Sequence, residues 1–140
     1  MSSHPGSVRA TVVVDVDSDT AFEVFTDEVA AWYRPIRGAP KLDADELMRF
    51  DEPSRRVLRN ETEVGRITVW EKGRRLVWVD RRDTEVEVRF EPHGTQTRVT
   101  LEHRGLERLS PEDGFSVVQY GWRRLAFQFE EYVQQKQEES

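Results

Sequence analysis

The chain has 140 residues, a formal net charge of −6 and a charged fraction of 34%. Acidic and basic residues are interleaved along it, so it lacks the clustered basic face with which nucleic-acid-binding proteins displace counterions. The absence of cysteine excludes disulfides and thiolate metal sites. The length is that of one domain with a hydrophobic core of its own.

The first predicted elements are a strand and two short helices. Residues 8–16 carry valine or alanine at every second position, which predicts a strand. Ser18 is a suitable helix N-cap, and Asp19 suits the positive end of the helix dipole. A first short helix follows, then a second over residues 28–33. The segment 34–46 contains Pro35, Gly38 and Pro40, and this composition predicts a loop.

From residue 47 to residue 104 the pattern predicts only strands. They form three hairpins and cover residues 47–50, 56–60, 65–71, 75–82, 84–91 and 97–104. In the last hairpin, pairing Arg89 with Glu102 and Glu87 with Arg104 satisfies both the alternation of apolar side chains and the opposite charges. The sheet therefore has one apolar face and one solvated face.

The last predicted element is a long helix that begins at Ser110, an N-cap followed by proline. Large apolar residues then recur at spacings of three and four: Phe115, Val118, Trp122, Leu125, Phe129, and Tyr132 or Val133. A helix with so broad an apolar stripe must pack on the apolar face of the sheet. We predict an α+β fold in which a curved antiparallel sheet of about seven strands wraps around this helix. Residues 8–133 form the single domain, with a disordered segment at 1–7 and a polar tail at 134–140.

Nothing in the chain predicts export or membrane insertion. Residues 1–7 are polar and lack the charged-then-apolar pattern of a signal peptide. The longest apolar stretch, around residues 10–16, is too short to span a bilayer. We therefore expect a cytoplasmic protein.

Four local patterns resemble one known family. They are VDVDS at 14–18 leading to AFEVFTD at 21–27; Trp32; GRI at 65–67 followed by KGRRLVW at 72–78; and TRVTLEHRGL at 97–106 followed by Gly121 and Trp122. In this order they resemble the START-like, or SRPBCC, superfamily, and within it the family of activators of the heat-shock-protein-90 ATPase. The resemblance covers residues 8–133. It implies the helix-grip fold and the binding of lipids, polyketides or other apolar molecules, with some members acting as co-chaperones or cyclases.

The predicted site is a cavity between the sheet and the C-terminal helix. Its candidate lining residues are Trp32, Tyr33, Phe50, Ile67, Val69, Trp78, Val88, Phe90, Leu101, His103, Val118 and Trp122. The alternation of side chains along a strand predicts that Ile67 and Val69 face inward and that Trp70 faces outward. Arg49 is expected to face outward, but a slip in register would bring an arginine inward, where it could hold a ligand carboxylate.

The chain offers little reactive chemistry. Of its histidines only His103 points inward, either to close the end of the sheet by hydrogen bonding or to serve as a polar anchor or general base. No three or four ligands at zinc spacing occur, and the acidic loop at Asp43, Asp45 and Glu46 lacks the pattern of a calcium loop. We assign no catalytic residue, metal or cofactor.

Three functions are compatible with these sequence features. The first is binding of a small apolar molecule of lipid, polyketide or aromatic type. The second is a cyclase or dehydratase acting in the same cavity, with His103 moving protons. The third is a protein-interaction module of co-chaperone type, which would need a large apolar or charged surface. We expect a monomer or a weak homodimer.

Overall fold

The computed structural model describes residues 7–33, 48–80, 83–106 and 115–139. Its elements in chain order are β1 (Val8–Val14), α1 (Ser18–Asp27), α2 (Val29–Trp32), β2 (Met48–Asp51), β3 (Arg56–Arg59), β4 (Thr62–Glu71), β5 (Arg75–Asp80), β6 (Glu85–His93), β7 (Gln96–Arg104) and α3 (Phe115–Glu139). The predicted 34–46 loop, the helix start at Ser110 and residues 1–6 lie outside the described residues. The N-cap of α1 is Asp17, one residue before the predicted one.

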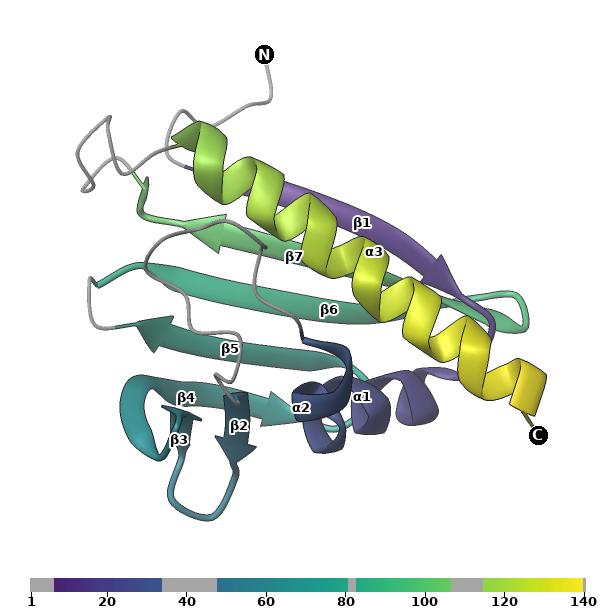
Figure 1. Ribbon diagram of the computed structural model, residues 1–140, viewed down its shortest axis with the longest axis horizontal. Helices are drawn as coiled ribbons and strands as arrows, with labels where there is room; N and C mark the ends of the chain where they lie inside the picture. Colours follow the sequence, from purple (N-terminus) through teal and green to yellow (C-terminus); the bar gives the residue numbers. More distant parts are fainter. Residues whose placement is uncertain (1–6, 34–47, 81–82, 107–114, 140) are drawn as a thin grey trace.

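The seven strands form one open antiparallel sheet in the order β1-β7-β6-β5-β4-β3-β2, so β1 closes onto the last strand of the chain. The helices lie on one face of this sheet, with α3 running along β1 and β7, and α1 and α2 beside the other strands (Figure 1). The α+β helix-grip prediction is therefore confirmed. Helix α3 continues to Glu139, through most of the predicted polar tail.

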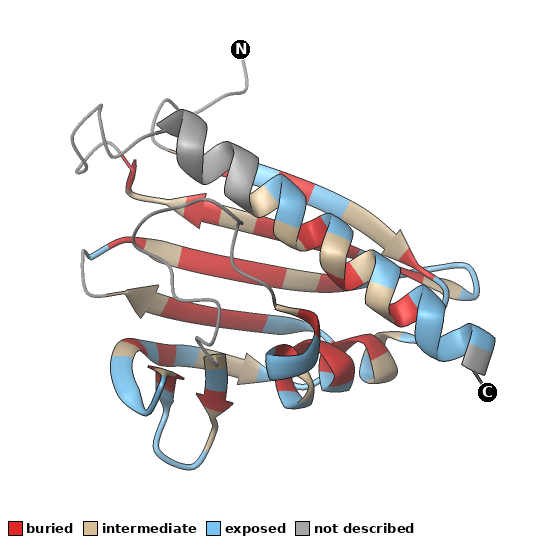
Figure 2. Ribbon diagram, in the orientation of Figure 1, coloured by how far each residue is buried: buried red, intermediate tan, exposed pale blue. Residues whose placement is uncertain are grey.

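The core fills the space between the helices and the inner face of the sheet, where buried residues gather (Figure 2). Phe25 of α1 lies at its centre. Its ring centroid is 4.9 Å from that of Trp32, 5.8 Å from Phe90 and 5.3 Å from Phe129 on α3. Aromatic pairs at these separations add to the burial energy of each ring, so they lock the helices onto the sheet.

A β-bulge in β4 reverses two of the predicted side-chain directions. The pairing with β5 shifts between Ile67 and Val69. Trp70 consequently packs inward, edge-to-face on Phe22 with centroids 5.2 Å apart. Val69 pairs with Val77 on the outer face, so its predicted inward position is wrong. The extra residue of a bulge changes strand parity, which simple alternation cannot detect.

The predicted register of the β6–β7 hairpin is also wrong, by two residues. Glu87 lies opposite Glu102, and Glu85 lies opposite Arg104. The strands run on to His93 and Gln96, leaving a turn of only two residues in which Gly94 has a φ of +67°. Such a turn needs a residue that tolerates positive φ, which glycine supplies.

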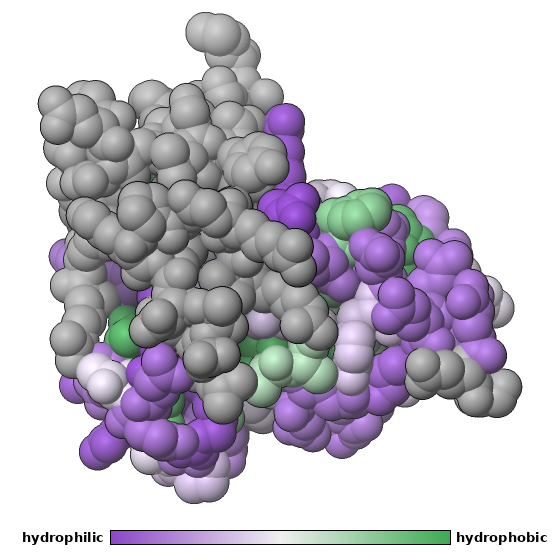
Figure 3. Space-filling view, viewed as in Figure 1, coloured by the Kyte–Doolittle hydropathy of each residue, from purple (hydrophilic) through white to green (hydrophobic). Residues whose placement is uncertain are grey.

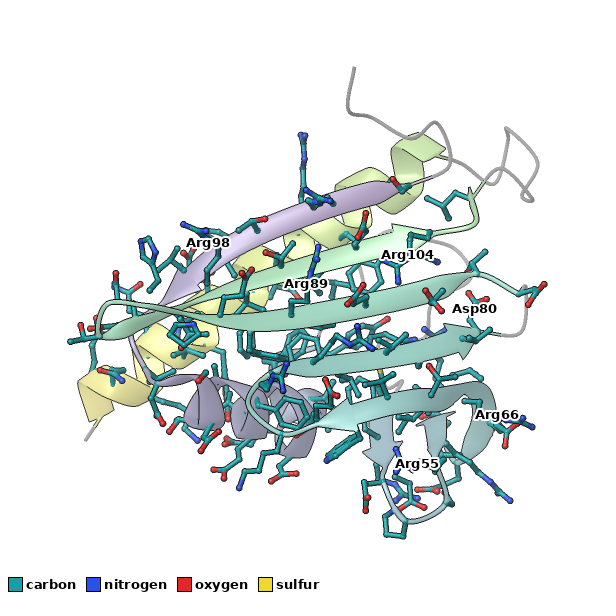
Figure 4. All side chains as sticks on the ribbon, turned by 180° about the vertical axis from the view of Figure 1, so that it is seen from behind. Arg55, Arg66, Asp80, Arg89, Arg98 and Arg104 are labelled. Atoms are coloured by element: carbon teal, nitrogen blue, oxygen red, sulfur yellow. The ribbon has the colours of Figure 1, made fainter. Side chains whose placement is uncertain are left out.

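The two predicted ion pairs nevertheless form, as diagonal neighbours on the outer face. Arg104 Nη1 lies 2.8 Å from Glu87 Oε1, and Arg89 Nη2 lies 3.6 Å from Glu102 Oε1. Arg104 also contacts Glu85 and Glu102. Where Figure 3 colours the surface on the side of α3, it is mostly hydrophilic, and Arg89, Arg98 and Arg104 mark the opposite, outer face of the sheet (Figure 4). Partial burial lowers the pKa of Arg104, but hydrogen bonds to Glu85 and Glu87 outweigh it and hold that pKa above its ordinary value.

Glu28, between α1 and α2, fastens these helices to α3. Its carboxylate accepts hydrogen bonds of 2.6 Å from Tyr132 Oη and from Lys136 Nζ. Partial burial raises the pKa of Glu28, but the hydrogen bonds from Lys136 and Tyr132 and the charge of Lys136 together bring it below its usual value of 4.5.

We expect Glu28→Gln to lower the free energy of unfolding by up to about 1 kcal/mol at pH 7, because the pair is partly exposed. A lowered pKa in the folded state gives stability that is present above pH 4.5 and lost as the pH falls through the folded pKa. The difference between variant and wild type should therefore shrink towards pH 3. Urea unfolding at both pH values measures it. Glu131→Gln, at an exposed position of α3, is the control. A constant difference at both pH values would contradict the role of the Glu28 charge.

Candidate functional site

A cavity of about 310 Å³ lies between the inner face of the sheet and α3. Its apolar lining is Met48, Val57, Val64, Trp78, Val86, Trp122 and Leu125, and its polar lining is Tyr33, Arg59, Asp80 and His103. These residues come from six of the seven strands, from the residue after α2 and from α3. The volume is at the lower end of the range for small-molecule sites, which are also mainly apolar with a few polar groups.

The structure brings only some of the predicted site residues to this cavity. Tyr33, Trp78, His103 and Trp122 line it. The others that point inward are buried in the core: Trp32, Phe50, Ile67, Val88, Phe90 and Leu101. Val69 lies on the outer face, and the side chain of Val118 lies outside the described residues. The sequence-based set was thus too wide, because strand parity alone cannot separate a cavity wall from packed core.

Gly65 allows one wall of the cavity to form. It lies in β4 between Val57 of β3 and Asp80 of β5. A Cβ atom at this position would lie 2.9 Å from the carbonyl oxygen of Val79 and 3.3 Å from Cδ1 of Trp78. The absence of a side chain therefore lets the Trp78 indole lie over the strand, beside Phe50 at 5.1 Å between centroids.

His103 is fixed at the β7 end of the cavity by two hydrogen bonds. Trp122 Nε1 donates to its Nδ1 at 2.9 Å, and its Nε2 lies 2.7 Å from Thr84 Oγ1. An indole N–H can only donate, so Nδ1 presents a lone pair and the neutral ring carries its proton on Nε2. The tautomer follows from these partners. His103 thus joins α3 to the end of the sheet, which agrees with the first of its two predicted roles.

Arg59 and Asp80 are the polar cavity residues that the sequence prediction missed. Arg59 ends β3, and its Nη2 donates to Tyr33 Oη at 3.3 Å. Asp80 ends β5, and its Oδ1 accepts from the backbone N–H of Thr84 at 3.0 Å. Strand alternation could have identified both residues. Arg59 stands two residues after Val57 and Asp80 two residues after Trp78, and both of these apolar residues face inward.

Arg49 behaves as expected. It is exposed and forms ion pairs with Asp51 and Glu61 at 3.3 and 2.8 Å. The arginine on the inner face is the neighbouring Arg59, whose Cα lies opposite that of Met48.

The described part of the chain contains neither a group of side chains suited to a metal ion nor a helix suited to a membrane. Within residues 7–33, 48–80, 83–106 and 115–139, no group of three or more His, Asp or Glu side chains could hold a metal ion. Within those same residues, no helix is both long and apolar enough to cross a membrane.

Three solved structures illustrate the likeness of this fold to known proteins. CalU16 from Micromonospora echinospora is 22% identical with a TM-score of 0.68, over 91% of this chain and 75% of that one. CalC, a self-sacrificing resistance protein from the same organism, is 23% identical with a TM-score of 0.61, over 94% and 96%. The Aha1 dimer from Colwellia psychrerythraea is 12% identical with a TM-score of 0.63, over 91% and 95%. At these identities the likeness concerns the fold.

The family assignment comes from the sequence itself. No curated protein matches the chain significantly. Residues 15–134, from just after β1 to the last turns of α3, match the family model described as "Activator of Hsp90 ATPase homolog 1-like protein". The match includes all the described residues that line the cavity. The chain therefore belongs to the Activator of Hsp90 ATPase homolog 1-like family.

Proposed function

We propose that this protein binds a small, mainly apolar molecule in the cavity between the sheet and α3. The observation that carries this proposal is the cavity itself, with an apolar wall and four polar side chains. Burial of apolar ligand surface is worth about 25 cal/mol per Å², and a few polar groups fix the ligand's orientation. The same fold occurs in CalC, which is described as a self-sacrificing resistance protein.

The hydrogen bonding of His103 favours binding over catalysis by this residue. A general base needs a lone pair directed at the substrate, whereas the Nδ1 lone pair of His103 already accepts a hydrogen bond from Trp122. A purely protein-binding role has less support, because Phe127 is the one large hydrophobic side chain found exposed among residues 7–33, 48–80, 83–106 and 122–138.

A neutral fluorescent naphthalene, N-phenyl-1-naphthylamine, tests the proposal. We expect wild-type protein to bind it with enhanced fluorescence, and Val64→Phe to weaken its affinity at least about tenfold, because the larger ring occupies the cavity. Val69→Phe is the matched control, since it adds the same volume to the same strand on the outer face. Circular dichroism establishes that both variants fold.

Native mass spectrometry of freshly purified protein supplies an independent measurement. A mass excess in the native spectrum that is lost on denaturation identifies a retained ligand. Absence of dye binding by the wild type, or equal binding by the Val64 and Val69 variants, would refute the cavity as the site.

A further inference from the structure

The two charged residues of the cavity stand on different strands. Arg59 is on β3 and Asp80 is on β5, two strands away, so their backbones are about 10 Å apart across the sheet at the usual strand spacing. The pairing places Asp80 opposite Gly65 and Gly65 opposite Val57, with Arg59 two residues further along β3. The backbone therefore places Arg59 at the β3 end of the cavity and Asp80 nearer its middle.

Arg59 is held by its surroundings in a position to face a ligand. It is half-buried, and Tyr33 Oη accepts a hydrogen bond from its Nη2 at 3.3 Å. The Tyr33 ring in turn packs edge-to-face on buried Trp32, with centroids 6.2 Å apart. A guanidinium group can donate several hydrogen bonds in a fixed fork, and a phenol that accepts one hydrogen bond can still donate its own proton. Together the two side chains offer donors to a single acceptor group.

Partial burial strengthens this arrangement. A charge interaction away from bulk water is screened less than one at the surface, so an anion next to Arg59 gains more than one next to exposed Arg49. The carboxylate of Asp80 disfavours the reverse orientation of an anionic ligand, since like charges repel. The remaining wall, including Trp78, Val86 and Leu125, is apolar.

We propose that the ligand is an organic anion with one acidic group, carboxylate or sulfonate in type, bound by Arg59 and Tyr33, and with an apolar body that lies towards Trp78 and α3. This rests on the proposed function, and it adds the chemical class of the ligand and its direction in the cavity.

Two probes with the same aromatic skeleton test the charge. They are 1-anilinonaphthalene-8-sulfonate, which is anionic, and N-phenyl-1-naphthylamine, which is neutral. We expect Arg59→Met to weaken binding of the anionic probe about 10- to 100-fold, the usual effect of losing a hydrogen bond to a charged group. The neutral probe should change by less than about threefold, because Met keeps the apolar volume of the arginine stem.

Arg49→Met is the matched control, because it removes an arginine of the neighbouring strand whose ion pairs lie outside the cavity. It should leave both affinities unchanged. Competition between the two probes establishes that they share one site. Should Arg59→Met fail to fold, Arg59→Gln removes the charge with a smaller change in polarity and carries the same expectation.

The outcomes separate the two proposals. If wild type binds the neutral probe but Arg59→Met weakens both probes equally, or Arg49→Met weakens the anion as much, the assignment of an anionic ligand is wrong and the cavity remains the site. If wild type binds neither probe, the proposed function fails, and the inference fails with it.

Discussion

Phe129→Ala is expected to lower the free energy of unfolding by about 3–5 kcal/mol, the usual cost of deleting a fully buried aromatic ring. Phe129 has 0% of its surface exposed, and its ring lies between those of Phe25 on α1 and Trp32 on α2, at 5.3 and 5.2 Å. Removing it leaves a cavity where three helices meet over the sheet. The favourable helix propensity of alanine offsets less than about 1 kcal/mol of the loss.

Phe127→Ala is the control for this experiment. Phe127 belongs to the same helix two residues earlier, but 55% of its surface is exposed. We expect a change within about 0.5 kcal/mol, as for most surface substitutions. Urea unfolding followed by circular dichroism measures both variants. Equal losses for the two would mean that α3 is not docked through the face that carries Phe129.

The docked face of α3 and the order of the elements could be predicted from the sequence because both depend on periodicity. Apolar residues at spacings of three and four identified Phe129 as core and left Tyr132 or Val133 as its successor; Phe129 and Val133 are fully buried, and Tyr132 is partly buried. The two-residue alternation likewise gave β1 and all six later strands. These patterns are repeated over many residues, so an error at one position does not change the element.

Side-chain direction within a strand was less predictable, because one irregularity alters every residue after it. The bulge between Ile67 and Val69 turns Trp70 into the core and Val69 out of it. In β5, Leu76, Val77 and Trp78 are all apolar, so alternation did not decide the side of Trp78. The structure places Leu76 and Trp78 inside, and Asp80 follows them by parity.

Arg59 was overlooked for a related reason. It stands directly before a turn in which Asn60 and Glu61 have φ of +51° and +67°, a position where polar residues are usually solvated. Its inward direction depends on Val57, two residues earlier, and on the facing Met48. A charged residue at the end of an inward-facing row is thus a sequence signal for a cavity group, provided that the strand is free of bulges up to that point.

Arg104→Met is expected to destabilise the fold by about 2–3 kcal/mol. Arg104 Nη1 contacts Glu87 and Glu102 at 2.8 and 2.9 Å, and the side chains of these glutamates are only 9% and 12% exposed. Breaking a fully buried ion pair costs about 3–5 kcal/mol because the remaining charge is left uncompensated. Arg104 itself is 35% exposed, so solvent reduces that figure. Arg9→Met, which removes a mostly exposed contact with Glu102 at 3.4 Å, should cost under about 1 kcal/mol.

A double-mutant cycle identifies the cause of the loss. Glu87→Gln removes the more buried of the two negative charges while it keeps the shape of the side chain. If the uncompensated charge is responsible, Arg104→Met combined with Glu87→Gln should be more stable than Arg104→Met alone, by about 1 kcal/mol or more, because the neutral glutamine leaves no uncompensated charge at this mostly buried position. Additive losses from the two substitutions would instead show that Arg104 and Glu87 are not energetically coupled, and the outer-face ion pairs would then contribute little to stability.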